Sequence, residues 1–151
     1  MKHVKKSVLL WYSAAEMYSL VTDVETYPQF LPWCAQTERL EHVGDAMKVR
    51  LTMAYGDLRH AFTTRNEHVA DRSVMIALVD GPFSLLEGHW QFRALGNGGD
   101  APERACRIEL EMRYAFSSRA LERVVSPVFD RVADTLVDSF VRRAEQVYGP
   151  R

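Results

Sequence analysis

The sequence predicts an α+β fold, in which a curved antiparallel sheet of six to seven strands surrounds one long C-terminal helix. Two patterns lead to this prediction. Between residues 35 and 116, apolar and polar side chains alternate with a period of two, which is typical of antiparallel strands with one solvated face. From Ser118 to Tyr148, apolar side chains recur at helical spacing, with Arg, Asp and Glu opposite them. A length of 151 residues fits a single domain, 1–151.

The first elements are expected to be a strand over His3–Trp11 and a helix that begins after Ser13. Ser13 fits an N-cap, and Glu16, three residues later, completes a capping box. This helix should end near Asp23.

A second helical turn is expected over Val24–Phe30, followed by the proline-flanked segment Tyr27–Cys34. Pro28 and Pro32 should break any regular element there, because proline lacks the backbone N–H and restricts the preceding residue. The segment would then be irregular and dense in large apolar groups.

The alternation is clearest in four runs, whose inward positions are Met47, Val49, Leu51 and Met53; Leu58, His60, Phe62 and Thr64; Leu86, Gly88, Trp90 and Phe92; and Cys106, Ile108, Leu110, Met112, Tyr114 and Phe116. Gly44-Asp45 and Gly56-Asp57 have the composition of two-residue hairpin turns. Asp80–Phe83 marks a further turn, and Gly96–Pro102 a longer hairpin loop. Because the connections are short, successive strands should pair as a meander.

Ser126-Pro127 interrupts the C-terminal helical pattern. Pro127 either begins a helix behind a Ser126 cap or kinks a continuous one. We expect a kink or a short break rather than two independent helices. Gly149-Pro150 forms the stop signal.

Composition narrows the function. The net charge of −1, from 19 basic and 20 acidic residues, argues against broad nucleic-acid binding, and no DNA partner is expected. A small basic patch is expected where Lys2, Lys5 and Lys6 cluster, and Arg142 with Arg143 forms a second. The two cysteines, Cys34 and Cys106, read as buried thiols in a reducing compartment, and the absence of a signal peptide or membrane span predicts a cytoplasmic protein. No pair of histidines has metal-ligand spacing.

A family resemblance emerges at three places. The run Tyr27-Pro28-Gln29-Phe30-Leu31-Pro32-Trp33-Cys34 strongly resembles the coenzyme-Q-binding family, as do Gly81-Pro82-Phe83 with Trp90-Gln91-Phe92 and the C-terminal Phe140–Gly149. That family includes polyketide cyclases and lipid-transport proteins of the START-like superfamily, and a bacterial branch called the ribosome association toxin. The resemblance implies a helix-grip fold with a cavity for a lipid-like molecule, of roughly 300–1,000 Å³ as for ordinary ligand pockets.

A sheet of this size spans roughly 30 Å and a helix about 10 Å, so the space between them is either a pocket or filled by side chains. The segment Tyr27–Cys34 is then either a gate or a plug. The residue types alone favour a plug, whereas the resemblance favours a gate. The expected ligand contacts are Tyr27, Phe30, Leu31, Pro32, Trp33, Met53, His60, Phe62, Phe83, Leu86, Trp90, Met112, Phe129 and Leu136.

His60 is the most unusual inward residue. It would donate a hydrogen bond to a quinone carbonyl, or else be satisfied by a neighbour or lie at the rim of the sheet. No catalytic residue is expected, because the inward positions offer little acid or base chemistry.

Three functions follow from the resemblance. The first is non-enzymatic binding or transport of ubiquinone or a related isoprenoid lipid, supporting respiration, with transient membrane contact. The second is association with the large ribosomal subunit, which would block subunit joining. An aromatase or cyclase ranks last.

Overall fold

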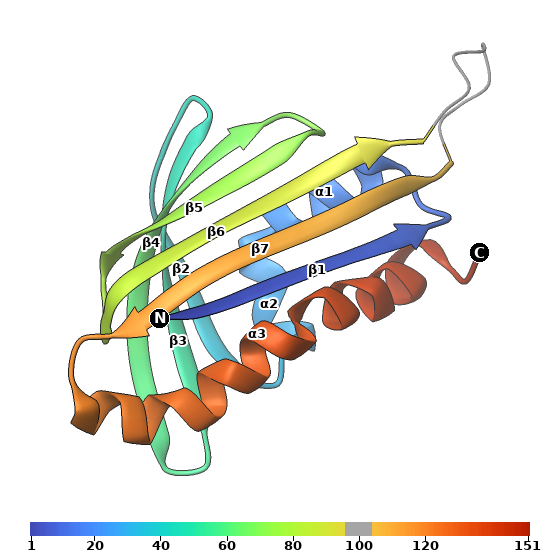
Figure 1. Ribbon diagram of the computed structural model, residues 1–151. Coiled ribbons are helices and arrows are strands. Elements are labelled where there is room, and N and C mark those ends of the chain that lie inside the picture. The colour runs from blue at the N-terminus through green and yellow to red at the C-terminus, as the bar shows by residue number, and fades with distance from the viewer. Residues whose placement is uncertain (96–103) are drawn as a thin grey trace.

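The structure is a computed structural model that describes residues 1–95 and 104–151. Its elements follow one another as β1 (Lys2–Leu10), α1 (Ala14–Thr22), η1 (Val24–Thr26), α2 (Tyr27–Phe30), β2 (Cys34–Val43), β3 (Ala46–Tyr55), β4 (Leu58–Val69), β5 (Ser73–Asp80), β6 (Phe83–Ala94), β7 (Cys106–Phe116) and α3 (Arg119–Tyr148). Seven strands form a curved sheet, and α3 runs across its concave side (Figure 1). The expected α+β architecture is confirmed.

The strand order is β1-β7-β6-β5-β4-β3-β2, with antiparallel pairing throughout. Strands β2 to β7 form the expected meander, and β1 joins the edge beside β7. The hairpin turns lie where the sequence predicts them, because Gly44 and Gly56 take up φ values of 58° and 60°, which glycine adopts without a Cβ clash. The predicted loop Gly96–Pro102 falls outside the described residues.

The helix α1 begins with the predicted capping box. Ser13 Oγ accepts from the Glu16 N–H at 3.0 Å, and Glu16 Oε1 accepts from the Ser13 N–H at 2.9 Å. The prediction that Pro28 breaks regular structure was wrong. Pro28 is the second residue of α2, where the missing N–H removes no helical hydrogen bond.

The helix α3 is continuous from Arg119 to Tyr148, with Pro127 inside it and Ser118 as its N-cap. A break at Pro127, and a helix starting there, are therefore both excluded. Figure 1 shows the axis of α3 changing direction in its first half, as a kink at proline would produce. Its buried face includes Val125, Phe129, Val132 and Phe140, which join the inward residues of the sheet in one core.

Candidate functional site

A small cavity lies between the concave face of the sheet and α3, with a volume of about 80 Å³. The predicted range was wrong, because large side chains from both layers fill most of the space. Four ring pairs around Phe129 and Phe140 illustrate this filling: Tyr114 with Phe129 at 4.7 Å between centroids, Phe83 with Phe129 at 4.8 Å, Phe30 with Phe140 at 5.2 Å, and Trp90 with Phe140 at 5.4 Å. As it stands, the cavity could not enclose an isoprenoid tail.

The residues that line the cavity are mostly apolar: Val24, Tyr27, Trp33, Val49, Leu51, Phe62, Thr64, Asn66, Ile76, Leu86, Gly88, Trp90, Leu110, Met112, Phe129, Val132, Leu136 and Phe140. Eight of the expected contacts belong to this lining: Tyr27, Trp33, Phe62, Leu86, Trp90, Met112, Phe129 and Leu136. The other six, outside the lining, are Phe30, Leu31, Pro32, Met53, His60 and Phe83. Met53 and Phe83 are nonetheless core residues.

The residue His60 does not reach the cavity. It pairs with Met53 in the β3–β4 ladder, near the start of β4, where it is half-buried. The rim position that the sequence left open for it is the one the structure shows. Two polar side chains further along β4, Thr64 and Asn66, border the cavity instead.

The side chains of Thr64 and Asn66 supply the hydrogen-bonding groups of the lining, together with the Tyr27 hydroxyl and the Trp33 and Trp90 indoles. Thr64 and Asn66 are 2% and 7% exposed, and the Thr64 hydroxyl donates to Asn66 Oδ1 at 2.9 Å. The alternation that placed Thr64 inward also places Asn66 inward, two residues on. Sequence reasoning missed Asn66 because the inward run of this strand was expected to end at Thr64.

The segment η1–α2 closes the cavity at one side. The Tyr27 hydroxyl donates to the Val21 carbonyl at the end of α1, and its ring packs edge-on against Phe140 at 5.6 Å between centroids. Burial raises the pKa of Tyr27 above the usual range for tyrosine. Leu31 is only 1% exposed, so this part of the segment is firmly packed.

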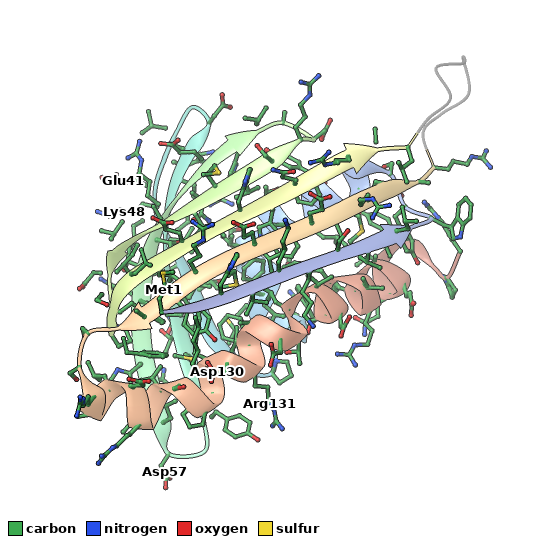
Figure 2. All side chains as sticks on the ribbon, viewed as in Figure 1. Met1, Glu41, Lys48, Asp57, Asp130 and Arg131 are labelled. Atoms are coloured by element: carbon green, nitrogen blue, oxygen red, sulfur yellow. The ribbon has the colours of Figure 1, made fainter. Side chains whose placement is uncertain are left out.

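Trp33 and Val132 lie between the inner cavity and a second pocket nearer the surface, because both spaces include these two residues in their lining. The outer pocket has a volume of about 90 Å³ and lies between Pro32, Tyr55, Pro127 and Arg131, among others. Arg131 Nη1 donates to the Tyr55 hydroxyl at 3.3 Å, linking α3 to the end of β3; Figure 2 labels Arg131, and Asp57 at the tip of the β3–β4 hairpin. Movement of Trp33 would connect the two spaces.

A polar cluster joins β1, β7 and the first half of α3. We call Lys2, Tyr114, Ser126 and Asp130 the latch. Lys2 pairs with Asp130, and the buried Tyr114 hydroxyl donates to Asp130 Oδ1 at 2.5 Å (Asp130 is labelled in Figure 2). Ser126 Oγ donates to Asp130 Oδ2 at 3.1 Å. Burial alone would raise the pKa of Asp130, but the hydrogen bonds from Lys2, Tyr114 and Ser126 outweigh it and hold the pKa below its ordinary value.

The two predicted basic patches do not form as expected. Lys2 and Lys6 share the half-buried face of β1, where Lys2 belongs to the latch, while Lys5 is on the opposite face near Glu111. Arg142 is exposed, but Arg143 donates to Gln29 Oε1 at 2.9 Å and stacks over Phe30. Residues adjacent in sequence point to opposite faces of a strand and to different sides of a helix, so these basic residues do not gather on one surface.

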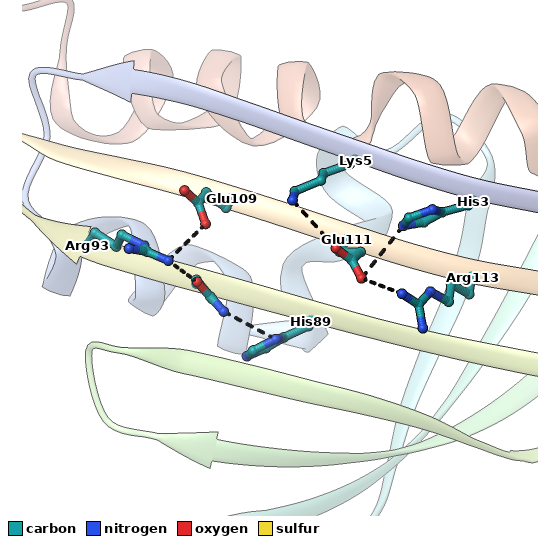
Figure 3. A network of polar contacts seen from close by, with 8 residues as sticks. His3, Lys5, His89, Arg93, Glu109, Glu111 and Arg113 are labelled. Atoms are coloured by element: carbon teal, nitrogen blue, oxygen red, sulfur yellow. Dashed lines mark hydrogen bonds and ion pairs between the residues drawn. The ribbon is translucent and has the colours of Figure 1, made fainter.

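The outer face of β1, β7 and β6 carries a lattice of charges of both signs (Figure 3). Glu111 lies among Lys5, His3 and Arg113, at distances of 3.9, 3.6 and 3.2 Å. Arg93 pairs with Glu109 at 3.4 Å. This face therefore has no uniform sign.

Both cysteines are buried, as expected. Burial raises the pKa of the Cys34 thiol to about 11, so this thiol is protonated at neutral pH. Within residues 1–95 and 104–151, no helix is both long and apolar enough to cross a membrane.

Comparisons with known proteins place the chain in a family. A family model described as polyketide cyclase / dehydrase and lipid transport matches residues 10–141. Ribosome association toxin RatA of Pseudomonas aeruginosa is 42% identical over 147 residues, which cover 97% of this chain and 98% of that protein. The protein of the same name from Escherichia coli is 36% identical, over 100% of this chain and 92% of that protein. A mitochondrial coenzyme Q-binding protein of Drosophila melanogaster is 26% identical, over 96% of this chain and 59% of that protein.

Among solved structures, a START superfamily protein from Mycobacterium smegmatis matches with a TM-score of 0.78 and 21% identity, covering 96% of this chain and 98% of that one. At that identity the likeness shows the fold, which is the helix-grip arrangement expected from the sequence. The family model spans most of the chain, and so the chain belongs to the polyketide cyclase / dehydrase and lipid transport family.

Proposed function

We propose that this protein associates with the large ribosomal subunit and thereby limits subunit joining, without catalysing a reaction. The observation that carries the proposal is the 42% identity to a ribosome association toxin over nearly the whole of both chains. The cavity volume of about 80 Å³ also supports it, because ordinary ligand pockets measure about 300–1,000 Å³ and a cavity this small does not favour lipid transport as the main role. Ribosome association therefore ranks above ubiquinone binding, which is the reverse of the ranking expected from the sequence.

The chemistry of the cavity favours a binding role over catalysis. Among the residues that line it, only Tyr27 titrates, and its hydroxyl is engaged with the Val21 carbonyl. The nearby Tyr114 hydroxyl is likewise held by Asp130. General acid–base catalysis needs a group whose pKa lies near the working pH. Burial raises the pKa of Tyr27 and of Tyr114, and so moves both pKa values further from neutral pH.

Sedimentation with purified large ribosomal subunits tests the proposal. We expect the protein to co-sediment at low salt and to be released as salt rises, because contacts with RNA phosphates exchange for counterions. Subunit joining should fall in the same preparation when the protein is added. No co-sedimentation at low salt, with the protein folded, would contradict the proposal.

The matched variants follow from the surface geometry. Arg142→Ala removes an exposed cation for which the described residues provide no ion pair, and leaves the interior intact. Arg143→Ala is the contrasting variant, since it also removes packing on Phe30. A role for this helix face predicts that Arg142→Ala shifts release to lower salt without changing stability.

Apolar ligand transport is the second candidate function. The apolar lining and the coenzyme Q-binding relative favour it. Binding ubiquinone or another isoprenoid would require the cavity to enlarge, and the position of Trp33 between the two pockets provides a route. Transfer would then involve transient membrane contact.

A further inference from the structure

At one end of the outer face of the sheet, two arginines lie directly opposite each other. Strands β1 and β6 both finish at this end, and β7 begins there (Figure 1). In the β6–β7 ladder Arg93 pairs with Arg107, and Leu9 of β1 pairs with Arg107 from the other side. Like charges directly opposite on neighbouring strands, about 5 Å apart, repel each other and destabilise a sheet. The arginine pair therefore has a local cost to the fold.

The positive charge of this arginine pair is only half balanced. Arg93 lies 3.4 Å from Glu109, as Figure 3 shows. The guanidinium of Arg107 donates to Ser7 Oγ at 3.2 Å, and within residues 1–95 and 104–151 it forms no ion pair. One positive charge is therefore left over at this end of the outer face.

A second like-charge pair on the outer face, Lys48 with Arg65, lacks this excess of charge. Glu41 is the ladder partner of Lys48 on its other side, and Arg65 Nε lies 3.6 Å from Glu67 Oε1. Each cation of this second pair thus has a carboxylate neighbour. The comparison shows that the imbalance belongs to the arginine pair and not to the outer face as a whole.

An exposed aromatic ring lies at the same end of the sheet as the arginine pair. Trp11 is 70% exposed. It follows two residues after Leu9, the ladder partner of Arg107, so roughly 7 Å of backbone separates the two positions along the strand. A hollow of about 760 Å³ borders the indole. The ring therefore has open space beside it and unbalanced positive charge nearby.

We propose that this end of the sheet contacts RNA of the large ribosomal subunit, with Trp11 stacked on an unpaired base and Arg93 and Arg107 holding neighbouring phosphates. The inference rests on the proposed function, which supplies the partner. Aromatic rings beside cationic side chains are the combination by which proteins bind single-stranded RNA. Phosphates along the strand supply the negative charge that the arginine pair lacks. The contact is local and so agrees with a net charge of −1 for the chain.

A short oligoadenylate RNA and the purified full chain test the stacking. Binding should quench the fluorescence of Trp11, because Trp33 and Trp90 are only 9% and 2% exposed. Trp11→Phe keeps a flat ring and should bind nearly as tightly as the wild type. Trp11→Leu keeps only apolar area and should weaken binding roughly tenfold, within the range for one stacked base. Equal affinities of Trp11→Phe and Trp11→Leu would overturn the proposal.

Salt titrations with the same RNA test the arginine pair. For single strands, each neutralised phosphate contributes about 0.7 to the slope of log K against log salt. Arg93→Gln and Arg107→Gln should each make the slope less steep by about that amount, whereas Arg65→Gln, from the balanced pair, should leave it unchanged. Arg107→Gln should not lower the free energy of unfolding, because it ends the repulsion with Arg93. Lower stability with an unchanged slope would identify a structural role alone and overturn the proposal.

Purified large subunits and lipid vesicles distinguish the possible failures. Trp11→Leu and Arg107→Gln should both reduce co-sedimentation with large subunits, and Arg65→Gln should not. If all variants co-sediment as the wild type does, the proposed function stands and this surface is wrong. If the wild type does not co-sediment but the variants change oligoadenylate binding as expected, the proposed function fails and the RNA-binding surface stands. Equal binding of the wild type and Trp11→Leu to phosphatidylglycerol vesicles, with no binding of oligoadenylate, would identify a lipid-binding surface and overturn the proposal.

Discussion

At the scale of single residues, the two interior tryptophans, Trp90 and Trp33, have different surroundings. Trp90 lies in mid-strand on β6, is 2% exposed, and packs against Phe140 and Phe92 at 5.4 and 6.1 Å between ring centroids. Trp33 lies in the connection before β2 and contacts both the inner cavity and the outer pocket. Hence Trp90 borders the inner cavity alone and is otherwise packed in the core, whereas Trp33 borders both pockets.

We expect Trp90→Ala to lower the free energy of unfolding by about 3–5 kcal/mol, because truncation leaves a large void between two packed layers. Trp33→Ala should cost less, since it merges two existing spaces, and it should speed the entry of a small apolar probe. Chemical denaturation and stopped-flow binding measure the two effects. Equal destabilisation with unchanged entry rates would identify the segment Tyr27–Cys34 as a plug rather than a gate.

The residue scale is also where sequence reasoning reaches its limit. Alternation correctly assigned Thr64 and Trp90 to the inward face, because the side-chain period of a strand is fixed. It could not tell that His60 lies outside the cavity lining while Asn66 borders the cavity. That difference depends on where α3 crosses the sheet, which no local pattern contains.

At the scale of elements, the latch holds the proline-containing half of α3 to the sheet. Pro127 removes one backbone donor from the helix, which frees a carbonyl and weakens the turn before it. Asp130, one turn later, ties the helix to Lys2 of β1 and Tyr114 of β7. We infer that these contacts offset the local loss of helical stability.

The latch makes stability depend on pH in a definable window. The pKa of Asp130 in the folded protein is lower than its ordinary value near 3.8. The stability that Asp130 contributes is therefore present above that ordinary value and is lost as the pH falls through the folded-state pKa. Burial raises the pKa of Tyr114, so its contribution is present below 10 and is lost at higher pH.

We expect Asp130→Asn to lower the free energy of unfolding at neutral pH. Between pH 5 and pH 3, roughly the range of carboxylate titration, the free energy of unfolding should fall less steeply in this variant than in the wild type. Asp138→Asn, at an exposed position of the same helix, is the control and should leave the acid limb unchanged. Urea titrations at several pH values measure both. An equal acid slope for the wild type and Asp130→Asn would show that the latch does not contribute.

At the scale of the whole molecule, periodicity and turn chemistry were enough to predict the layers. Gly44-Asp45 and Gly56-Asp57 forced adjacent strands to pair, and the capping box at Ser13 fixed the start of α1. The place of β1 beside β7 joins residues 96 to 112 positions apart, so no local signal predicts it. Cavity volume is equally non-local, because it is a small difference between a large enclosed space and the side chains that fill it.

The two edge strands differ in how well the rest of the molecule covers them. β1 is half-buried at every second residue and is tied to α3 by Lys2. The first half of β2 is covered by η1, where the Thr37 hydroxyl donates to the Val24 carbonyl at 2.8 Å. The second half, Glu38–Val43, is exposed at every residue (Glu41 and Lys48 beside it are labelled in Figure 2).

This asymmetry predicts where the fold opens first. Local opening is cheapest where few apolar groups are buried and backbone hydrogen bonds meet solvent. We therefore expect amide hydrogen exchange to be fastest, among the strands, in the second half of β2, slower in β1, and slowest in β6 and β7, which pair on both sides. Exchange measured by mass spectrometry resolves these segments. Lys2→Ala should raise the exchange rate of β1 toward that of β2 and leave the exchange rate of β6 unchanged. If β2 instead exchanged as slowly as β7 in the isolated protein, another molecule, such as a second copy of this chain paired along the free edge, would have to cover it; exchange that then rose on dilution would identify that copy.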